Sequence, residues 1–232
     1  MTKARSVGVY DDLYRMQLAG TRGLTLPSEN FVRLMIRGHI APGAEGARAL
    51  DFGCGDGCIS EYLLARGYRV TASDVSEAAL EVTRRRLQGR GEFDLRTPDE
   101  AGLLRGIADD SCEMVVAWAV LHWLGERDKW CTTVTELLRI LAPGGNLLMT
   151  MPTEDHYLKR YSLEIGVSQY LAKTPDRTDC VFYAPNLYTL KHMFERDFKL
   201  AIGQILRYDE GSTTTEHSLT DRFSMYGFCL KK

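Results

Sequence analysis

The sequence lacks a long hydrophobic run and a recognisable secretion signal. Its longest apolar run spans residues 114–121, well short of the roughly 20 residues that cross a bilayer. The first residues, Met-Thr-Lys-Ala-Arg-Ser, lead into charged sequence without an apolar signal core. We therefore expect a cytoplasmic protein without a membrane partner.

An excess of charge of either sign is also absent. Lys and Arg number 29 and Asp and Glu 31 in 232 residues, which gives a formal net charge of −2. Such a chain has no general attraction for phosphate backbones or anionic membranes. The one basic run, residues 84–86, follows Glu81 at helical spacing and indicates a solvated helix face. We expect no nucleic-acid partner.

The cysteine spacing excludes the common zinc and redox motifs. The six cysteines are scattered, and the nearest pair, Cys54 and Cys58, is separated by three residues rather than two. We expect reduced thiols, as in a cytosolic protein, and no bound metal.

From residue 47 onward, short apolar runs alternate with helical patterns. This alternation is typical of βαβ units and a parallel sheet, so the fold class is α/β with helices on both faces. We predict five strands in this region and two more near the end of the chain, which form an antiparallel hairpin at one sheet edge. The predicted strands cover residues 48–52, 68–73, 92–95, 113–118, 146–151, 199–207 and 222–230.

We expect one domain over residues 1–232, made of four parts. Two short helices form an N-terminal cap, a cofactor-binding core follows, and a helix and the hairpin end the chain. A long insertion after the fifth strand exceeds the usual connection of about 4–6 residues, which favours a lid with its own helix. These parts are residues 1–46, 47–151, 184–232 and, for the lid, 153–183.

The strongest local pattern is the turn Asp51-Phe52-Gly53-Cys54-Gly55-Asp56-Gly57 between the first strand and helix. Glycines allow a sharp bend and let a ligand approach the backbone without meeting a Cβ. The dinucleotide fingerprint G-x-G-x-x-G is not matched, because Cys58 stands at its third glycine. The carboxylate of Asp51 would repel a pyrophosphate and attract an ammonium group. A structural turn without a ligand is the alternative.

At these residues the sequence resembles the class I S-adenosylmethionine-dependent methyltransferases, small-molecule type. Their glycine motif D/E-x-G-x-G-x-G is matched in full, and Asp74 matches the acidic residue that ends their second strand. Residues 110–115 and 137–145 resemble the family's entries to strands four and five. The resemblance implies a Rossmann-like fold with a seven-stranded, mostly parallel sheet and one antiparallel edge strand. It also implies S-adenosyl-L-methionine as cofactor and S-adenosyl-L-homocysteine as product.

The resemblance also assigns roles to matched positions. Asp51 would hold the methionine ammonium, Asp74 both ribose hydroxyls, and Val75 would pack on the adenine. For the residue that meets the adenine amino group, we prefer Asp99 over Glu100 and Asp94, although the sequence departs from the family pattern there. The full predicted cofactor set is Asp51, Gly53, Cys54, Gly55, Gly57, Asp74, Val75, Asp99, Ala117 and Trp118.

Several of these residues have structural alternatives. Asp74 would also suit the start of a helix beside Ser76. Trp118 either borders the methionine portion, with a cation–π contact to the sulfonium, or is a core residue. His122 is the best-placed general base for a hydroxyl acceptor, but a histidine there would also serve to orient a loop.

The acceptor class follows partly by elimination. The sequence contains neither the Asn/Asp-Pro-Pro-Tyr/Phe motif after strand four nor a Pro-Cys dipeptide, which excludes the amino-methylating DNA enzymes and the cytosine-C5 enzymes. We expect a small-molecule acceptor, methylated at oxygen or nitrogen rather than carbon. Candidate acceptor contacts, each with a core position as the alternative, are Tyr10, Tyr14, His156, Tyr157 and Arg160. The rival functions are a non-catalytic S-adenosylmethionine-binding protein and an NAD-dependent dehydrogenase.

Overall fold

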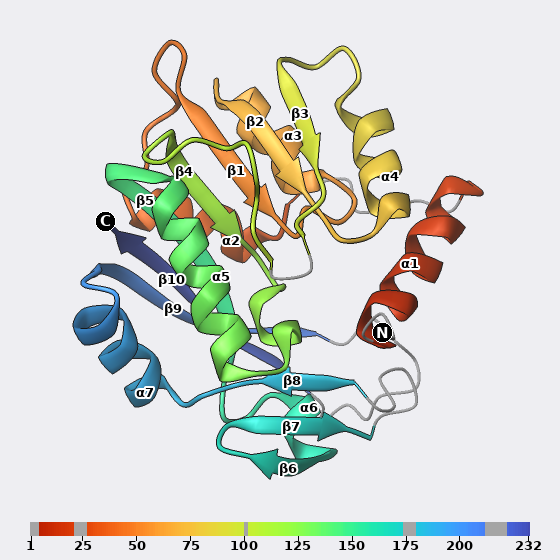
Figure 1. Cartoon of the computed structure of the whole chain (residues 1–232), viewed down its shortest axis with the longest axis vertical. Coiled ribbons are helices and arrows are strands. Elements are labelled where there is room, and N and C mark those ends of the chain that lie inside the picture. Colours follow the sequence, from red (N-terminus) through yellow and green to blue (C-terminus); the bar gives the residue numbers. More distant parts are fainter. Residues whose placement is uncertain (1–4, 21–26, 100–101, 174–179, 212–221) are drawn as a thin grey trace.

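A seven-stranded sheet forms the centre of the computed structural model, which describes residues 5–20, 27–99, 102–173, 180–211 and 222–232 (Figure 1). The strand order is β3-β2-β1-β4-β5-β10-β9. The strands are β1 (Arg48–Phe52), β2 (Arg69–Ser73), β3 (Phe93–Arg96), β4 (Cys112–Ala117), β5 (Leu141–Pro152), β9 (Ala201–Gly211) and β10 (Arg222–Lys231).

Strands β1 to β5 run parallel, and β10 runs antiparallel to both of its neighbours, β5 and β9. The predicted fold class and C-terminal hairpin are confirmed. The strand of opposite direction is β10, which lies one position inside the edge that β9 forms.

Helices cover both faces of this sheet. One face carries α2, α3 and α4, and the other carries α5 and α7, while α1 packs against α4. Among the described residues, no helix has the length and apolar character to cross a membrane. The helices are α1 (Arg5–Leu18), α2 (Glu29–Arg37), α3 (Cys58–Ala65), α4 (Glu77–Leu87), the 3-10 helix η1 (Leu121–Leu124), α5 (Arg127–Ile140), α6 (Tyr157–Arg160), α7 (Leu187–His192) and the π-helical turn η2 (Met193–Asp197).

Strand β4 shows why the sheet is buried on both sides. Val115 and Ala117 pack into the cluster under α5, and Met114 and Val116 pack into the cluster under α2 and α3. All four side chains are fully buried, as expected of a central parallel strand whose two faces are both covered.

The junction of α5 and β5 differs from the prediction. We expected the helix to end at the Pro-Gly-Gly sequence and the strand to begin at Asn146. Instead α5 ends at Ile140 and β5 begins at Leu141. The register against β4 jumps from the Cys112–Leu141 pair to the Met114–Asn146 pair, so the Pro-Gly-Gly segment is the irregular part of the strand.

The insertion contains a small sheet that the sequence analysis missed. Strands β6 (Ser162–Gly166), β7 (Gln169–Ala172) and β8 (Val181–Tyr183) form an antiparallel sheet, and α6 is a single turn. This sheet lies near the carboxyl ends of the parallel strands, at the bottom of Figure 1. Its own apolar cluster includes Tyr157, Leu158 and Phe182. Only three of its strand positions, Ala172, Phe182 and Tyr183, are buried, so the sequence shows little hydrophobic alternation there.

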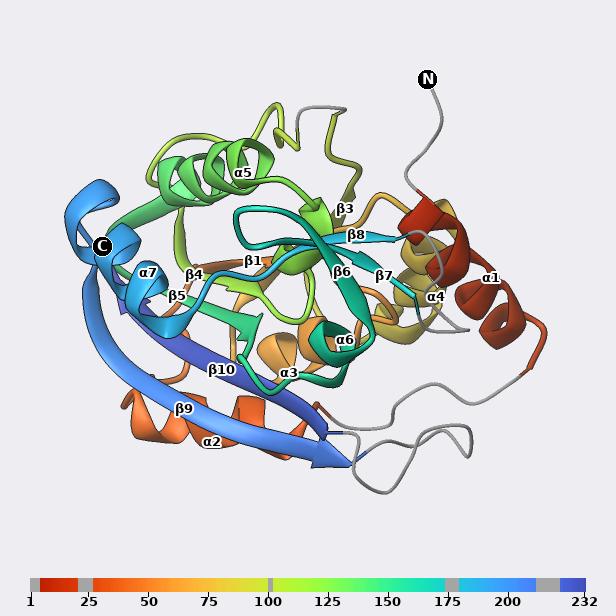
Figure 2. The same ribbon diagram turned by 90° about the horizontal axis from the view of Figure 1, so that it is seen from below.

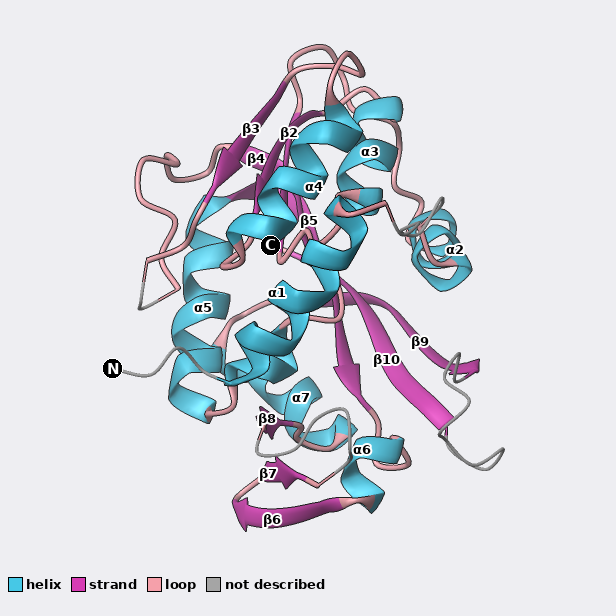
Figure 3. Cartoon of the chain, turned by 90° about the vertical axis from the view of Figure 1, so that its right-hand side faces the viewer, coloured by secondary structure: helices cyan, strands magenta, loops and turns pink. Residues whose placement is uncertain are grey.

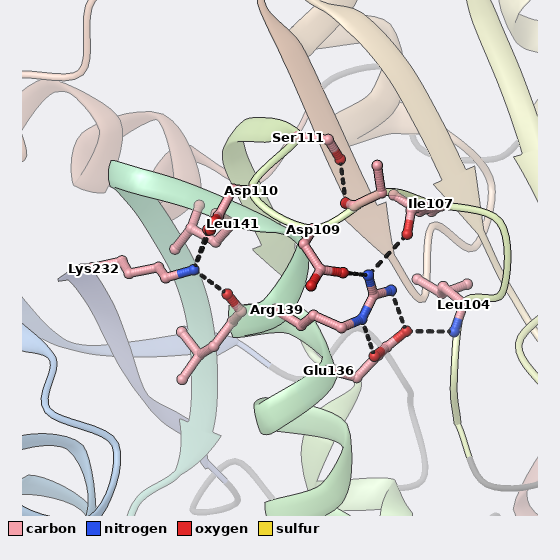
Figure 4. A network of polar contacts seen from close by, with 11 residues as sticks. Leu104, Ile107, Asp109, Asp110, Ser111, Glu136, Arg139, Leu141 and Lys232 are labelled. Carbon is pink, nitrogen blue, oxygen red and sulfur yellow. Dashed lines mark hydrogen bonds and ion pairs between the residues drawn. The ribbon is translucent and has the colours of Figure 1, made fainter.

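A polar network joins the segments at the other end of the sheet, near the start of β4 (Figure 4). Arg139 donates to both carboxylate oxygens of Glu136 at 2.8 Å and to the carbonyl of Ile107 at 2.9 Å, while Glu136 accepts from the amide of Leu104. Lys232 donates to Asp110 at 2.6 Å. These contacts join α5, the loop that precedes β4, and the residue that follows β10. They lie away from the carboxyl ends of the parallel strands.

Candidate cofactor and acceptor site

The glycine turn joins β1 to α3 and needs glycine at three positions. Gly53, Gly55 and Gly57 have φ values of +73°, +56° and +76°, a region that side chains other than glycine enter at a cost. A Cβ on Gly53 would lie 2.5 Å from Val120, and one on Gly55 would lie 2.6 Å from the hydroxyl of Tyr14. The end of β4 and helix α1 therefore both approach this turn closely.

Replacing Gly53 with alanine should destabilise the protein beyond the cost of a positive φ. Gly46 has a φ of +81° with open space where a Cβ would lie, so Gly46→Ala reports the backbone strain alone. We expect Gly53→Ala to lower the free energy of unfolding by about 1–3 kcal/mol more than Gly46→Ala, because overpacking adds to the strain. Urea denaturation of both variants measures the difference. Equal losses would contradict the close approach of Val120.

Hydrogen bonds to the neighbouring strand and helix fix the shape of the turn. The amides of Gly53 and Cys54 both donate to the carbonyl of Ser73, at 2.7 and 2.9 Å. The carbonyl of Gly55 accepts from the hydroxyl of Thr83 on α4 at 3.0 Å. The turn is thus held in place before any ligand arrives.

Asp51, the fourth residue of β1, is a buried acid. Its side chain is 1% exposed, and one oxygen accepts a hydrogen bond from the hydroxyl of Ser60 on α3 at 2.6 Å. Burial raises its pKa from the ordinary value of 3.8 to about 7, and the negative charge of Asp74 adds to the effect. Ionised Asp51 therefore requires a positive partner, which is what an ammonium group supplies. Sequence reasoning missed Ser60, because its burial against Asp51 depends on how α3 packs on β1.

Asp74 follows β2 and organises the same site from the other side. One oxygen accepts from the amide of Gly55 at 3.0 Å, and the other accepts from the amide of Ser76 at 2.9 Å. A carboxylate offers about four acceptor positions, so two remain for a ligand with two hydroxyls. Burial raises the pKa of Asp74, and the nearby charge of Asp11 raises it further. The adjacent Val75 is half-exposed at 47%, as a residue that packs on a ligand would be.

The acidic residues near β3 are the candidates for contact with the adenine amino group. The carboxylate of Asp99 accepts from the amide of Leu103 and from Arg105, both at 2.9 Å, so it stabilises its own turn. Asp94 is exposed and pairs with Arg96, and Glu100 lies outside the described residues. A contact from Asp99 to an adenine amino group stays a prediction.

The end of β4 lies over the turn. Ala117 is fully buried, and Ala119 has a φ of +56°, held by a hydrogen bond from its amide to the hydroxyl of Thr150 at 2.8 Å. Trp118 points to the α2 face, where its ring lies 5.2 Å from Phe31 and is parallel to Tyr208. Trp118 therefore has a core environment, and its contact with a cofactor stays a prediction.

His122 lies in η1, directly after this segment. Its side chain is 4% exposed, and its ring lies 4.7 Å from that of Trp123. Trp123 in turn contacts Phe182 of β8 at 6.2 Å. The predicted base is thus held between the end of β4 and the sheet of the insertion.

The candidate acceptor residues fall into two groups. Tyr14 on α1 reaches the glycine turn, whereas the side chain of Tyr10 lies outside the described part of that helix. In the insertion, Arg160 is exposed at the end of α6, and His156 and Tyr157 are 2% and 1% exposed. Among the members of this set whose side chains are described, Tyr14 is the one seen in contact with the turn.

The environment of His156 fixes its chemistry. Its Nδ1 accepts from the amide of Leu158 at 3.1 Å as the cap of α6, which leaves the proton of the neutral ring on Nε2. Burial lowers the pKa of His156 to about 3. His156 is neutral at any pH near 7 and serves as a donor there, not as a base.

Known methyltransferases are similar to this chain in sequence and in fold. A family model described as "Methyltransferase domain" matches residues 50–149. The demethylmenaquinone methyltransferase of Clavibacter sepedonicus is 36% identical over 126 residues, which cover 54% of this chain and 49% of that protein. A ubiquinone biosynthesis O-methyltransferase of Alkalilimnicola ehrlichii is 30% identical over 142 residues, covering 61% and 56%.

Residues 50–149 of the chain therefore form a methyltransferase domain, and this domain resembles those of the class I S-adenosylmethionine-dependent methyltransferases. The chain also has the fold of the N-methyltransferase NodS from Bradyrhizobium japonicum, solved with S-adenosyl-L-homocysteine, at a TM-score of 0.65 and 17% identity over 96% of this chain and 98% of that one. The chain spans about half the length of the curated relatives that it matches.

Proposed function

We propose that the protein transfers a methyl group from S-adenosyl-L-methionine to a small-molecule acceptor, at oxygen or nitrogen rather than carbon. The observation that carries the proposal is the pair of carboxylates on either side of the glycine turn, the buried Asp51 and the partly buried Asp74. Their negative charge suits a cationic amino-acid nucleoside and opposes an anionic dinucleotide. The names of the relatives, which include an O-methyltransferase and an N-methyltransferase, support the choice of acceptor atom.

The residues present fit this cofactor. Asp51 would hold the ammonium group, the two remaining acceptor positions of Asp74 would hold the ribose hydroxyls, and Val75 would contact the adenine. Gly53, Cys54, Gly55 and Gly57 would line the methionine side. When bound, the cofactor supplies an electrophilic methyl group on a sulfonium, and the protein supplies orientation and exclusion of water.

The acceptor side would be formed by α1, η1 and the insertion of residues 153–183, which act as cap and lid. Tyr14 approaches the turn from α1, and His122 lies in η1, which follows the Val120 that approaches Gly53. A hydroxyl acceptor must lose its proton as the new bond forms, and a nearby imidazole that accepts it typically contributes about 10²–10⁴-fold to the rate. We assign that role to His122.

The His122→Ala variant should lose turnover and keep its cofactor. We expect kcat to fall by about 100-fold, at the lower end of general-base effects, with the affinity for S-adenosyl-L-homocysteine changed by less than about twofold, since His122 is not assigned to cofactor binding. Steady-state kinetics with a cognate acceptor and titration calorimetry measure the two quantities. The matched control is His192→Ala, which removes an exposed histidine of α7. Unchanged kcat in His122→Ala would contradict the role of base.

Two measurements test the proposed function. Titration calorimetry with S-adenosyl-L-homocysteine should give a Kd below about 100 µM, equivalent to about −5.5 kcal/mol, and absence of binding would overturn the proposal. A screen of metabolite pools with labelled methyl donor should then show transfer to a small molecule. Binding without any turnover would instead support a non-catalytic binding protein, and enhanced NADH fluorescence would support a dehydrogenase.

A further inference from the structure

One of the contacts between helix α1 and the proposed cofactor site is a hydrogen bond to a buried serine. The carboxylate of Asp11 accepts a hydrogen bond of 2.6 Å from the hydroxyl of Ser76, which is 2% exposed. Figures 2 and 3 both show α1 beside α4, whose first residue follows Ser76. The contact joins residues separated by 65 positions in the chain, so it reports tertiary packing and not local structure.

Ser76 links this contact to the carboxylate assigned to the ribose. Its hydroxyl caps α4 by accepting from the amide of Ala79 at 3.1 Å, and its own amide donates to Asp74 at 2.9 Å. The hydroxyl has one proton to donate, and that proton is directed to Asp11. A movement of α1 therefore changes the environment of Ser76, which donates a hydrogen bond to Asp74.

One face of α1 makes these contacts. Asp11, Tyr14 and Arg15 are three and four residues apart, which is the spacing of neighbours on a helix surface. Arg15 donates to the second oxygen of Asp11 at 2.9 Å and so orients its carboxylate, while the hydroxyl of Tyr14 lies against Gly55. Asp12, which follows Asp11 in the sequence, is exposed.

The charges explain why docking of α1 should depend on a ligand. With the site empty, α1 brings the negative charge of Asp11 close to that of Asp74, and like charges disfavour each other. A ligand that donates hydroxyl hydrogens to Asp74 and carries positive charge offsets this repulsion. Binding of such a ligand and docking of α1 should then favour each other by the same factor, because coupling free energies are reciprocal.

We propose that Asp11 is a positioning residue that docks α1 over the cofactor site through Ser76, so that cofactor binding and helix docking are coupled. This inference rests on the proposed function, since it takes the ligand at Asp74 to be S-adenosyl-L-methionine or its product. The proposal adds Asp11 to the residues that influence cofactor binding, beyond the glycine turn and Asp74.

The test compares Asp11→Ala with Asp12→Ala in the full chain. Both variants remove one negative charge and gain the same helix propensity, but only the first loses the contact with Ser76. We measure the Kd for S-adenosyl-L-homocysteine by calorimetry, and the hydrogen exchange of the α1 amides with and without it. Because docking of α1 and binding of the ligand favour each other by the same factor, we expect the Kd of Asp11→Ala to rise at least about tenfold and that of Asp12→Ala to stay within about twofold.

Hydrogen exchange of the α1 amides distinguishes a positioning role of Asp11 from a merely structural one. In the wild-type protein and in Asp12→Ala, the ligand should slow exchange along α1, and in Asp11→Ala it should not. Asp11→Asn keeps an oxygen that accepts from Ser76, and we expect it to recover part of the ligand-induced protection. Equal Kd values for Asp11→Ala and Asp12→Ala, or binding to the wild type without slower exchange in α1, would overturn this proposal and leave the proposed function intact. Failure of the wild type to bind would overturn both.

Discussion

Asp51→Asn is expected to stabilise the free protein and to weaken cofactor binding. Asparagine has nearly the same shape as aspartate and keeps an oxygen that accepts from Ser60, but it removes a buried charge. The pKa of Asp51 is about 7 in the folded protein against 3.8 ordinarily. The charged form is therefore disfavoured by folding, and the cost of burying this group grows as the pH rises from about 4 to about 7.

The sign of the pH dependence follows from that raised pKa. The contribution of Asp51 to stability is fully present below its unfolded pKa near 4 and is lost as the pH rises through about 7. A shift of about three units corresponds to about 4 kcal/mol. At about pH 8, Asp51→Asn should be more stable than the wild type by up to that amount, and near pH 4 the two should be similar. Urea denaturation at both pH values, without cofactor, measures the difference.

Cofactor binding, unlike stability, should favour the ionised form of Asp51. Loss of one partner of a buried charge pair costs about 2–5 kcal/mol, so the Kd of Asp51→Asn for S-adenosyl-L-homocysteine should rise at least about 30-fold at pH 8. Wild-type affinity should increase about tenfold between pH 6 and pH 8 as Asp51 ionises, while that of the variant stays flat. A variant that is less stable at pH 8 and binds as well as the wild type would contradict the assignment.

Asp74→Asn is expected to lose most cofactor affinity without loss of fold. The two hydrogen bonds from ribose hydroxyls to a carboxylate would be replaced by weaker ones to a neutral amide, and each charged bond is worth about 1.5–3 kcal/mol. We expect the Kd to rise about 30- to 100-fold. The remaining amide oxygen still accepts from one of the two amides that now bind Asp74, those of Gly55 and Ser76, so the turn should persist.

A matched variant separates the site from general charge effects. Asp94→Asn removes the same charge from an exposed position on β3, where the carboxylate pairs with Arg96. Its Kd should stay within about twofold of the wild type, because exposed pairs contribute about 0–1 kcal/mol. Calorimetry on both variants, with circular dichroism to confirm folding, is the measurement. A Kd of Asp74→Asn within about threefold of the wild type, equivalent to less than about 0.7 kcal/mol, would leave Asp74 as a residue of the helix start only.

The sheet and the glycine turn were predictable because local patterns determine them. The run Arg48–Phe52 is the strand that we predicted, and Ser76, a residue type that favours helix starts, caps α4 through the amide of Ala79. Strand β4 was clear because it is apolar on both faces, which is a property of the sequence alone. Long-range pairing decided the remaining elements: the Pro-Gly-Gly segment belongs to β5 because β4 pairs on both sides of it.

The acceptor side was less predictable for the same reason. His156 and Tyr157 were candidate acceptor contacts with a core position as the alternative, and both pack against Phe223 of β10, at ring distances of 5.4 and 4.4 Å. No local pattern shows that a strand 66 or more residues later covers them. The link between Asp11 and Ser76 was invisible in the sequence in the same way, since it depends on where α1 docks.

The central claim is that the site over β1 and β2 is built for a cationic amino-acid nucleoside. A crystal structure of the protein with S-adenosyl-L-homocysteine tests it most directly. The account predicts the amino group of the ligand within hydrogen-bond distance of Asp51, directly or through one water, and both ribose hydroxyls on Asp74. A ligand bound elsewhere, or a pyrophosphate group lying on the glycine turn after a soak with NAD, would contradict it.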